Sequence, residues 1–152
     1  MAYLINSEGN VEFVLELGKE YEMGNSDHET WMPGVLRLSS ETKNVEMGKD
    51  INFTLNVYEV KQLVKGINNL ISCFGEKESS SFSFCNMESN FELKFDNILE
   101  DEVIEIEVWI NIANQTKGNI FGYDEGIRFI ANKEKVQKFA DAINEDLLGK
   151  AD

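Results

Sequence analysis

The chain has 152 residues, of which 42% are hydrophobic, and a formal net charge of −14 at pH 7. Its ten phenylalanines exclude a disordered acidic chain, and its length favours one domain spanning residues 1–152. The charge makes nucleic acids and anionic membranes poor partners and a basic protein a good one, although solubility alone also explains such acidity.

The beginning of the chain contains a motif that returns eighty positions later. Residues 6–13 match residues 86–93, with asparagine and glutamate at the same alternate positions. A second match, at an offset of seventy-six, joins residues 51–56 to residues 127–132. This self-similarity predicts two copies of one supersecondary unit that share a core. The copies are repeat 1, about residues 1–75, and repeat 2, about residues 79–150.

Alternating apolar and polar residues mark the strands of both repeats. The pattern occupies residues 11–17, 51–56, 91–96 and 104–110. A period of two is typical of antiparallel strands with one face in the core and one in water. The repeated asparagine motif precedes two of these strands. There we expect a hairpin turn, with Gly9 and the asparagines available for positive φ.

The first helix is predicted directly after a strand. Apolar residues recur at i, i+3, i+4 and i+7 spacing through residues 57–74, the pattern of a half-buried helix. Asn56 is placed to cap this helix, Glu59 to complete a capping box, and Gly75 to end it.

A second apolar stripe, over residues 136–147, follows a capping residue at Asn132 and closes near Gly149. Together the elements predict an α+β fold of two fused ββββα repeats. We expect an antiparallel sheet with two helices packed on its apolar face, and a pseudo-twofold axis between the repeats.

Few residues could carry catalytic or metal chemistry. His28 is the only histidine, which is too few for a zinc site and favours a solvated loop residue. Cys73 and Cys85 lack metal-binding or redox spacing, so we expect reduced thiols. No glycine-rich phosphate motif or nucleophile motif occurs. We therefore predict no enzyme, no cofactor and no metal, although a carboxylate pair such as Glu105 and Glu107 leaves a hydrolase as an open alternative.

Acidic residues gather at the same place in both repeats. Residues 8–29 contain seven acids and one lysine, and residues 88–107 contain eight acids and one lysine, whereas the predicted helices are nearly neutral. This duplication indicates an acidic face opposite the helices; solvation of exposed strands explains it equally well. Trp109 alternates with the apolar residues of its strand, so it belongs on the outer face, either as an anchor for an arginine-rich partner or as a cover for a loop. The predicted partner-binding residues are Glu20, Glu22, Asp27, Glu29, Glu100, Asp101, Glu102, Glu105, Glu107 and Trp109.

Several segments together resemble the WapI-type immunity proteins. The resemblance covers most of the chain and consists mainly of a pattern of apolar positions. It lies in residues 13–17, the acidic loop before Trp31, the helix from Val57, and residues 82–84 and 90–95. It implies a small protein that binds and neutralises the C-terminal toxin domain, of nuclease type, of a wall-associated protein of Gram-positive bacteria.

The function we predict is therefore that of an intracellular immunity protein that covers the basic surface of a toxin. Residues 1–6 lack the basic region of a signal peptide, and no run approaches the roughly 18 apolar residues of a membrane span, so we expect a cytoplasmic location. An acidic structural or regulatory binding module without a toxin partner is the alternative, and a carboxylate-based hydrolase is the third possibility.

Overall fold

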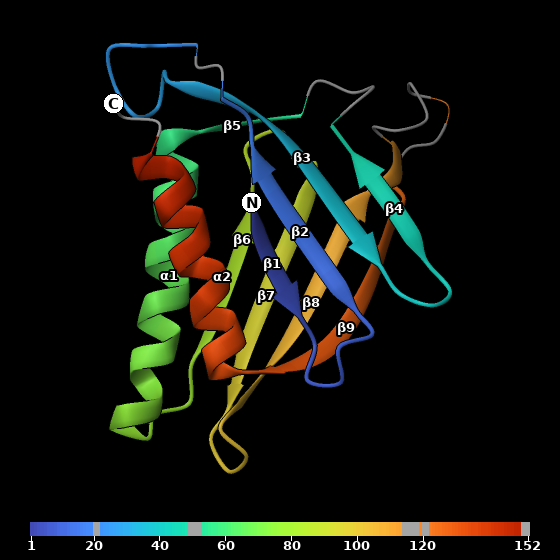
Figure 1. Ribbon diagram of the computed structural model, residues 1–152, viewed down its shortest axis with the longest axis vertical. Helices are drawn as coiled ribbons and strands as arrows, with labels where there is room; N and C mark the ends of the chain where they lie inside the picture. Colours follow the sequence, from blue (N-terminus) through green and yellow to red (C-terminus); the bar gives the residue numbers. More distant parts are fainter. Residues whose placement is uncertain (20–21, 49–52, 114–118, 120–121, 150–152) are drawn as a thin grey trace.

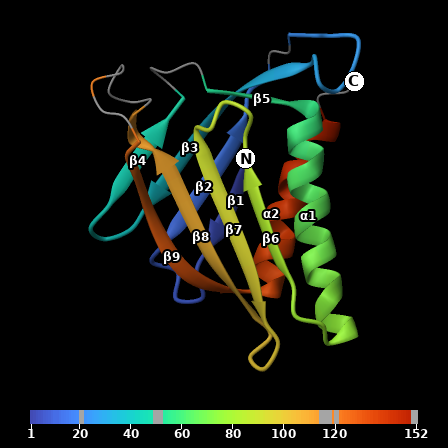
Figure 2. The same cartoon turned by 180° about the vertical axis from the view of Figure 1, so that it is seen from behind.

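The computed structural model describes residues 1–19, 22–48, 53–113, 119 and 122–149. These residues form two antiparallel sheets that lie face to face, with two helices along one side of the pair (Figure 1, Figure 2). Along the chain the elements are β1 (Ala2–Ile5), β2 (Glu12–Leu17), β3 (Trp31–Ser39), β4 (Asn44–Met47), β5 (Thr54–Asn56), α1 (Val57–Glu76), β6 (Ser81–Cys85), β7 (Phe91–Ile98), β8 (Val103–Asn111), β9 (Asp124–Asn132) and α2 (Lys133–Leu148). The α+β class and the repeated order of strands and helix are confirmed, but the single antiparallel sheet expected from the sequence is two sheets, because the described strands of each repeat pair only with one another.

The first sheet has the order β1-β2-β3-β4 and the second sheet the order β6-β7-β8-β9. β3 pairs with β4 through residues 36–39 and with β5 through residues 31–33, so these two short strands share one edge of β3. In repeat 2 a single strand, β9, pairs with β8 over the whole length of both. The fourth strand of repeat 1 is thus in two pieces. Ile51 and Asn52, which the alternation assigned to it, lie outside the described residues.

Asn6 organises the turn between β1 and β2. Its side-chain oxygen accepts hydrogen bonds from the backbone N–H groups of Asn10 (2.9 Å) and Val11 (3.0 Å). Its amide nitrogen donates to the side-chain oxygen of Asn10 (2.7 Å). Gly9 has a φ of 81°, a conformation that most side chains avoid. The predicted hairpin turn and the role of Gly9 are confirmed.

The turn between β6 and β7 repeats this hydrogen-bond network. The side-chain oxygen of Asn86 accepts from the backbone N–H groups of Asn90 (2.8 Å) and Phe91 (3.2 Å), and its amide nitrogen donates to the side-chain oxygen of Asn90 (2.9 Å). Here Ser89 has the positive φ, 52°, instead of a glycine or an asparagine. The sequence repeat therefore corresponds to a repeated turn that sets where the second strand of each repeat begins.

Asn56 and Glu59 form the predicted capping box at the start of α1. Asn56 Oδ1 accepts from the backbone N–H of Glu59 (2.8 Å), and Glu59 Oε2 accepts from the backbone N–H of Asn56 (2.9 Å). The predicted end of this helix is wrong, because α1 continues through Gly75 to Glu76. Lys77 has a φ of 55° and donates its backbone N–H to carbonyls of the last turn, so the chain turns there without a glycine.

Each helix packs mainly on the sheet of the other repeat. α1 lies along β6 and β7, α2 lies along β1, and the two helices contact each other (Figure 1). The third residue of each helix also contacts the hairpin turn of the other repeat. Glu59 Oε1 accepts a hydrogen bond from the backbone N–H of Met87, and Lys135 Nζ donates to the backbone carbonyl of Asn6 (2.6 Å). The two repeats therefore complete each other.

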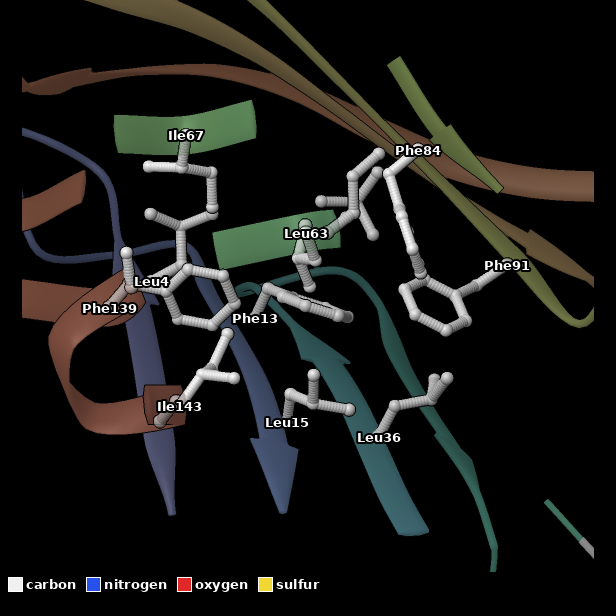
Figure 3. Packing of buried hydrophobic residues seen from close by; sticks show 14 of the residues in the cluster. Leu4, Phe13, Leu15, Leu36, Leu63, Ile67, Phe84, Phe91, Phe139 and Ile143 are labelled. Atoms are coloured by element: carbon white, nitrogen blue, oxygen red, sulfur yellow. The ribbon is translucent and has the colours of Figure 1, made fainter. Parts of the chain in front are cut away.

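One hydrophobic cluster contains buried residues of both repeats. The ring centroids of Phe13 in β2 and Phe91 in β7 lie 6.1 Å apart, and Phe139 of α2 lies 6.0 Å from Phe13 (Figure 3). Leu63 and Ile67 of α1 point into the same cluster (Figure 3). Burying such a side chain stabilises a fold by roughly 1.5–3 kcal/mol, so these rings bind the two sheets and both helices together.

Candidate functional site

The outer face of the second sheet carries rows of charged side chains. Lys94 of β7, Glu107 of β8 and Arg128 of β9 are cross-strand neighbours in one row. Arg128 Nε donates to Glu107 Oε1 at 2.9 Å and lies 3.8 Å from Glu105 Oε1. Carboxylates outnumber cations on this face. Its charged residues are Glu92, Lys94, Asp96, Glu105, Glu107, Asp124 and Arg128.

Trp109 lies on the same face, as the alternation of β8 predicted. Its indole N–H donates to Glu107 Oε2 at 2.8 Å. Its cross-strand neighbour in β9 is Gly126, and a Cβ atom there would lie only 2.6 Å from the indole ring. The indole therefore lies across the backbone of β9, a position that a larger residue at 126 would obstruct.

The neighbours of Glu107 favour its ionised form. The hydrogen bond from Trp109 lowers the pKa of Glu107 below the usual 4.5, and the hydrogen bond from Arg128 lowers it further. The same carboxylate raises the pKa of Arg128. The two charges therefore persist over a wide pH range, and Glu107 is fixed between an aromatic and a cationic side chain.

The loop between β7 and β8 holds Glu100, Asp101 and Glu102, which are all exposed. Glu102 has a φ of 51° and lies 3.3 Å from the ammonium of Lys133 at the start of α2. An exposed ion pair of this kind contributes little to stability. The loop continues into the outer face through Glu105, so these acidic residues form one connected region.

The acidic loop between β2 and β3 has a structural role at the start of α1. The carboxylate of Asp27 lies 2.6 Å from the ammonium of Lys61, and its backbone carbonyl accepts from Tyr58 N at 3.2 Å. Glu29 accepts a hydrogen bond from the backbone N–H of Asn25 at 3.0 Å. Asp27 therefore satisfies a helix N–H that has no partner within the helix.

The predicted partner-binding residues fall into two groups. Glu22, Asp27 and Glu29 lie near the start of α1, at one end of the molecule, whereas residues 100–102 lie at the other end (Figure 1, Figure 2). Equivalent loops of the two repeats therefore lie at opposite ends of the molecule (Figure 1). Glu20 lies outside the described residues.

The remaining candidates for chemistry are His28 and the two cysteines, of which Cys85 is the cross-strand neighbour of Glu92 on the outer face. His28 is exposed and its ring stacks on Tyr58, with 3.9 Å between the centroids. Cys73 and Cys85 are free thiols. The described part of the chain contains no group of three or more side chains suited to hold a metal ion. Within the same residues, no helix is long and apolar enough to cross a membrane.

Sequence reasoning missed the role of several residues on the outer face. Arg128 pairs with acids on β8, Glu92 is the cross-strand neighbour of Trp109, and Asp124 lies in the next row. The alternation of β7 predicts that Glu92 lies on the outer face. The contacts of Arg128, in contrast, depend on the register between β8 and β9. A single sequence does not reveal that register.

The chain was compared with known proteins and protein families. No curated protein matches the chain. A family match extends over residues 3–148, which is nearly the whole chain and includes both repeats and both helices. The resemblance seen in the sequence is thereby confirmed. The chain belongs to the Immunity protein WapI-like family.

Proposed function

We propose that this protein acts inside the cell as an immunity protein that binds a toxin domain and blocks its activity. The observation that carries the proposal is the family match over residues 3–148. Such a protein needs no catalytic residues and no cofactor, because occupation of the toxin surface is sufficient. The cytoplasm is the compartment where an antidote of this kind protects the cell that makes it.

The proposed contact surface is acidic and its partner is basic. A nuclease-type toxin binds phosphates and therefore presents cationic side chains around its active site. A chain with a net charge of −14 attracts such a surface over long range and speeds association. The toxin would then be blocked at the surface that its nucleic-acid substrate needs.

The connected acidic region at β8 is the principal part of the proposed surface. Glu105, Glu107 and Trp109 lie on the outer face, and the exposed loop acids extend it to the end of the sheet. The loop near α1 forms a second acidic area. The full set proposed for partner contact is Glu20, Glu22, Asp27, Glu29, Glu100, Asp101, Glu102, Glu105, Glu107 and Trp109.

Co-expression tests the proposed function. A toxin domain identified in a neighbouring reading frame would be expressed from an inducible promoter in a heterologous host, with and without this protein. We expect growth arrest without it, growth in its presence, and a stable complex on size-exclusion chromatography. Continued growth arrest with the folded protein present at equal level would contradict the proposal and favour a binding module without a toxin partner.

A further inference from the structure

A small cavity lies beside Trp109 on the outer face of the second sheet. Its volume is about 120 Å³. Its walls include the indole of Trp109, the carboxylate-bearing residues Glu92 and Asp124, and the residues Cys85 and Asn111. An aromatic wall and two acidic residues around one small space favour a cationic group with a flat, partly apolar surface.

The aromatic wall of this cavity is held in place. The indole rests over Gly126, where a Cβ atom would lie 2.6 Å from the ring, and its N–H is bound to Glu107. The amide of Asn111 is also fixed, because its nitrogen donates to the carbonyl of Ser89 (3.1 Å) and its oxygen accepts from the backbone N–H of Ala113 (3.0 Å). A preformed cavity loses little conformational entropy when it is filled.

The two carboxylates can accept a new partner. Glu92 is 39% exposed, and its nearest cation is Lys94, at 3.6 Å. Asp124 is exposed, and no hydrogen bond or ion pair involves its side chain among the described residues. A long contact to a flexible lysine is weak, so an incoming cation would compete with it at low cost.

We infer that this cavity receives an arginine side chain of the partner protein, with the guanidinium stacked on Trp109 and paired with Glu92 and Asp124. The inference rests on the proposed function and names the side chain that the acidic surface selects. Arginine fits better than lysine, because its planar guanidinium stacks on an aromatic face while its N–H groups bind carboxylates in the plane.

Short peptides test the inference without the toxin. Acetylated and amidated tetra-arginine and tetra-lysine peptides would be titrated into the full chain by calorimetry at fixed ionic strength. We expect the arginine peptide to bind about threefold more tightly, as a modest cation–π contribution implies. The Trp31→Phe variant leaves Trp109 as the only tryptophan, and its fluorescence should change with the arginine peptide.

Matched variants separate the cavity from general charge attraction. Glu92→Gln and Asp124→Asn should each weaken binding of the arginine peptide by about threefold. Glu145→Gln, which removes the same charge from an exposed position of α2, should weaken binding less. Trp109→Leu should abolish the preference for arginine. Equal weakening by all three carboxylate variants, or equal affinity for both peptides, would overturn the inference.

The inference and the proposed function can fail separately. If the peptide results fail but co-expression still protects the host, the protein neutralises its toxin through other contacts. If the cavity selects arginine but no protection occurs, the proposed function fails while the cavity keeps its specificity.

Discussion

Two acidic regions of this protein look alike in sequence and differ in structure. In the loop before β3, Asp27 pairs with Lys61 and its carbonyl accepts an N–H of α1, while Glu29 binds the backbone of Asn25. In the loop after β7, Glu100 and Asp101 are exposed and make no such contacts within the described residues. Clustered acids therefore differ in how far the fold already uses them, since the first loop supports the start of α1, whereas Glu100 and Asp101 have no contact in the described part of the chain that a partner would need to replace.

On the outer face of the second sheet, the Trp109 indole packs against Gly126. Of the substitutions considered, Gly126→Ala should have the largest effect on stability. The new Cβ atom would lie 2.3 Å from the carbonyl of Val108 and 2.6 Å from the Trp109 indole. We expect a loss of about 2–3 kcal/mol in the free energy of unfolding, since overpacking forces the backbone to shift. Urea denaturation measures this loss.

Gly75→Ala is the matched control for that substitution. Its Cβ atom would meet no other atom within 4 Å, and the residue lies inside α1. Alanine there should stabilise the protein by about 0.5–1 kcal/mol. A comparable loss in both variants would show that the outer face has no special packing requirement.

Reversing the exposed loop tests whether its acids serve the partner. The variant with Glu100→Lys, Asp101→Lys and Glu102→Lys should slow association with the toxin domain by about tenfold and flatten its salt dependence. The fold should remain, because only the exposed pair of Glu102 with Lys133 is lost. Stopped-flow kinetics at several salt concentrations measures the effect.

The control for loop reversal places the same charges on α2. The substitutions Glu134→Lys, Asp141→Lys and Glu145→Lys change the net charge equally on the helix side. If these helix reversals slow association and the loop reversals do not, the contact surface lies on the helix side of the molecule.

The buried side chain of Thr30, in the loop before β3, is not one of the proposed contact residues, so its substitution should affect stability and leave partner binding unchanged. Thr30 is buried, and its hydroxyl accepts from Gly24 N (3.2 Å) and donates to the carbonyl of Ser26 (2.9 Å). Thr30→Val removes both hydrogen bonds and should cost about 1–2 kcal/mol. Thermal denaturation combined with a binding assay separates the two effects, and a large loss of affinity at unchanged stability would contradict the structural role.

The smallest expected effect is the pH response of Glu107. Its pKa in the folded protein is lowered by Trp109 and Arg128. A lowered carboxyl pKa stabilises the fold above the unfolded pKa, and that stabilisation is lost as the pH falls through the folded pKa. We therefore expect Glu107→Gln to flatten the acid side of the stability curve slightly. Carboxyl NMR titration should give a midpoint below 4.5 for Glu107, and a midpoint at or above this value would rule out the stabilising role of both neighbours.

Local signals predicted much of the fold correctly. The start of α1 was predicted from Asn56 and Glu59, and the start of α2 from Asn132. Both predictions were correct because capping depends on residues only a few positions apart. The asparagine turns are local in the same way. The predicted end of α1 at Gly75 was wrong, because the helix ends one residue later and Lys77 adopts the left-handed conformation that glycine usually provides.

The candidate surface was harder to predict because it depends on long-range pairing. Alternation placed Trp109 outward, but only the β8–β9 register brings Gly126 under its ring and Arg128 beside Glu107. The sequence repeat also predicts that the equivalent acidic loops belong to one face. In the structure these loops lie at opposite ends of the molecule (Figure 1), and the order of residues along the chain does not show how the two repeats are oriented relative to each other.

The exchange of helices between the repeats has a consequence for synthesis on the ribosome. When repeat 1 has emerged, α1 still lacks β6 and β7, and β1 still lacks α2, so apolar surface on both stays uncovered. α2 is made after the other described elements and covers β1, and the amine of Met1 then contacts the carboxylate of Asp146. A nascent chain of this protein therefore gains protection from proteases and from aggregation only after α2 has emerged, so chains truncated before α2 become targets for degradation.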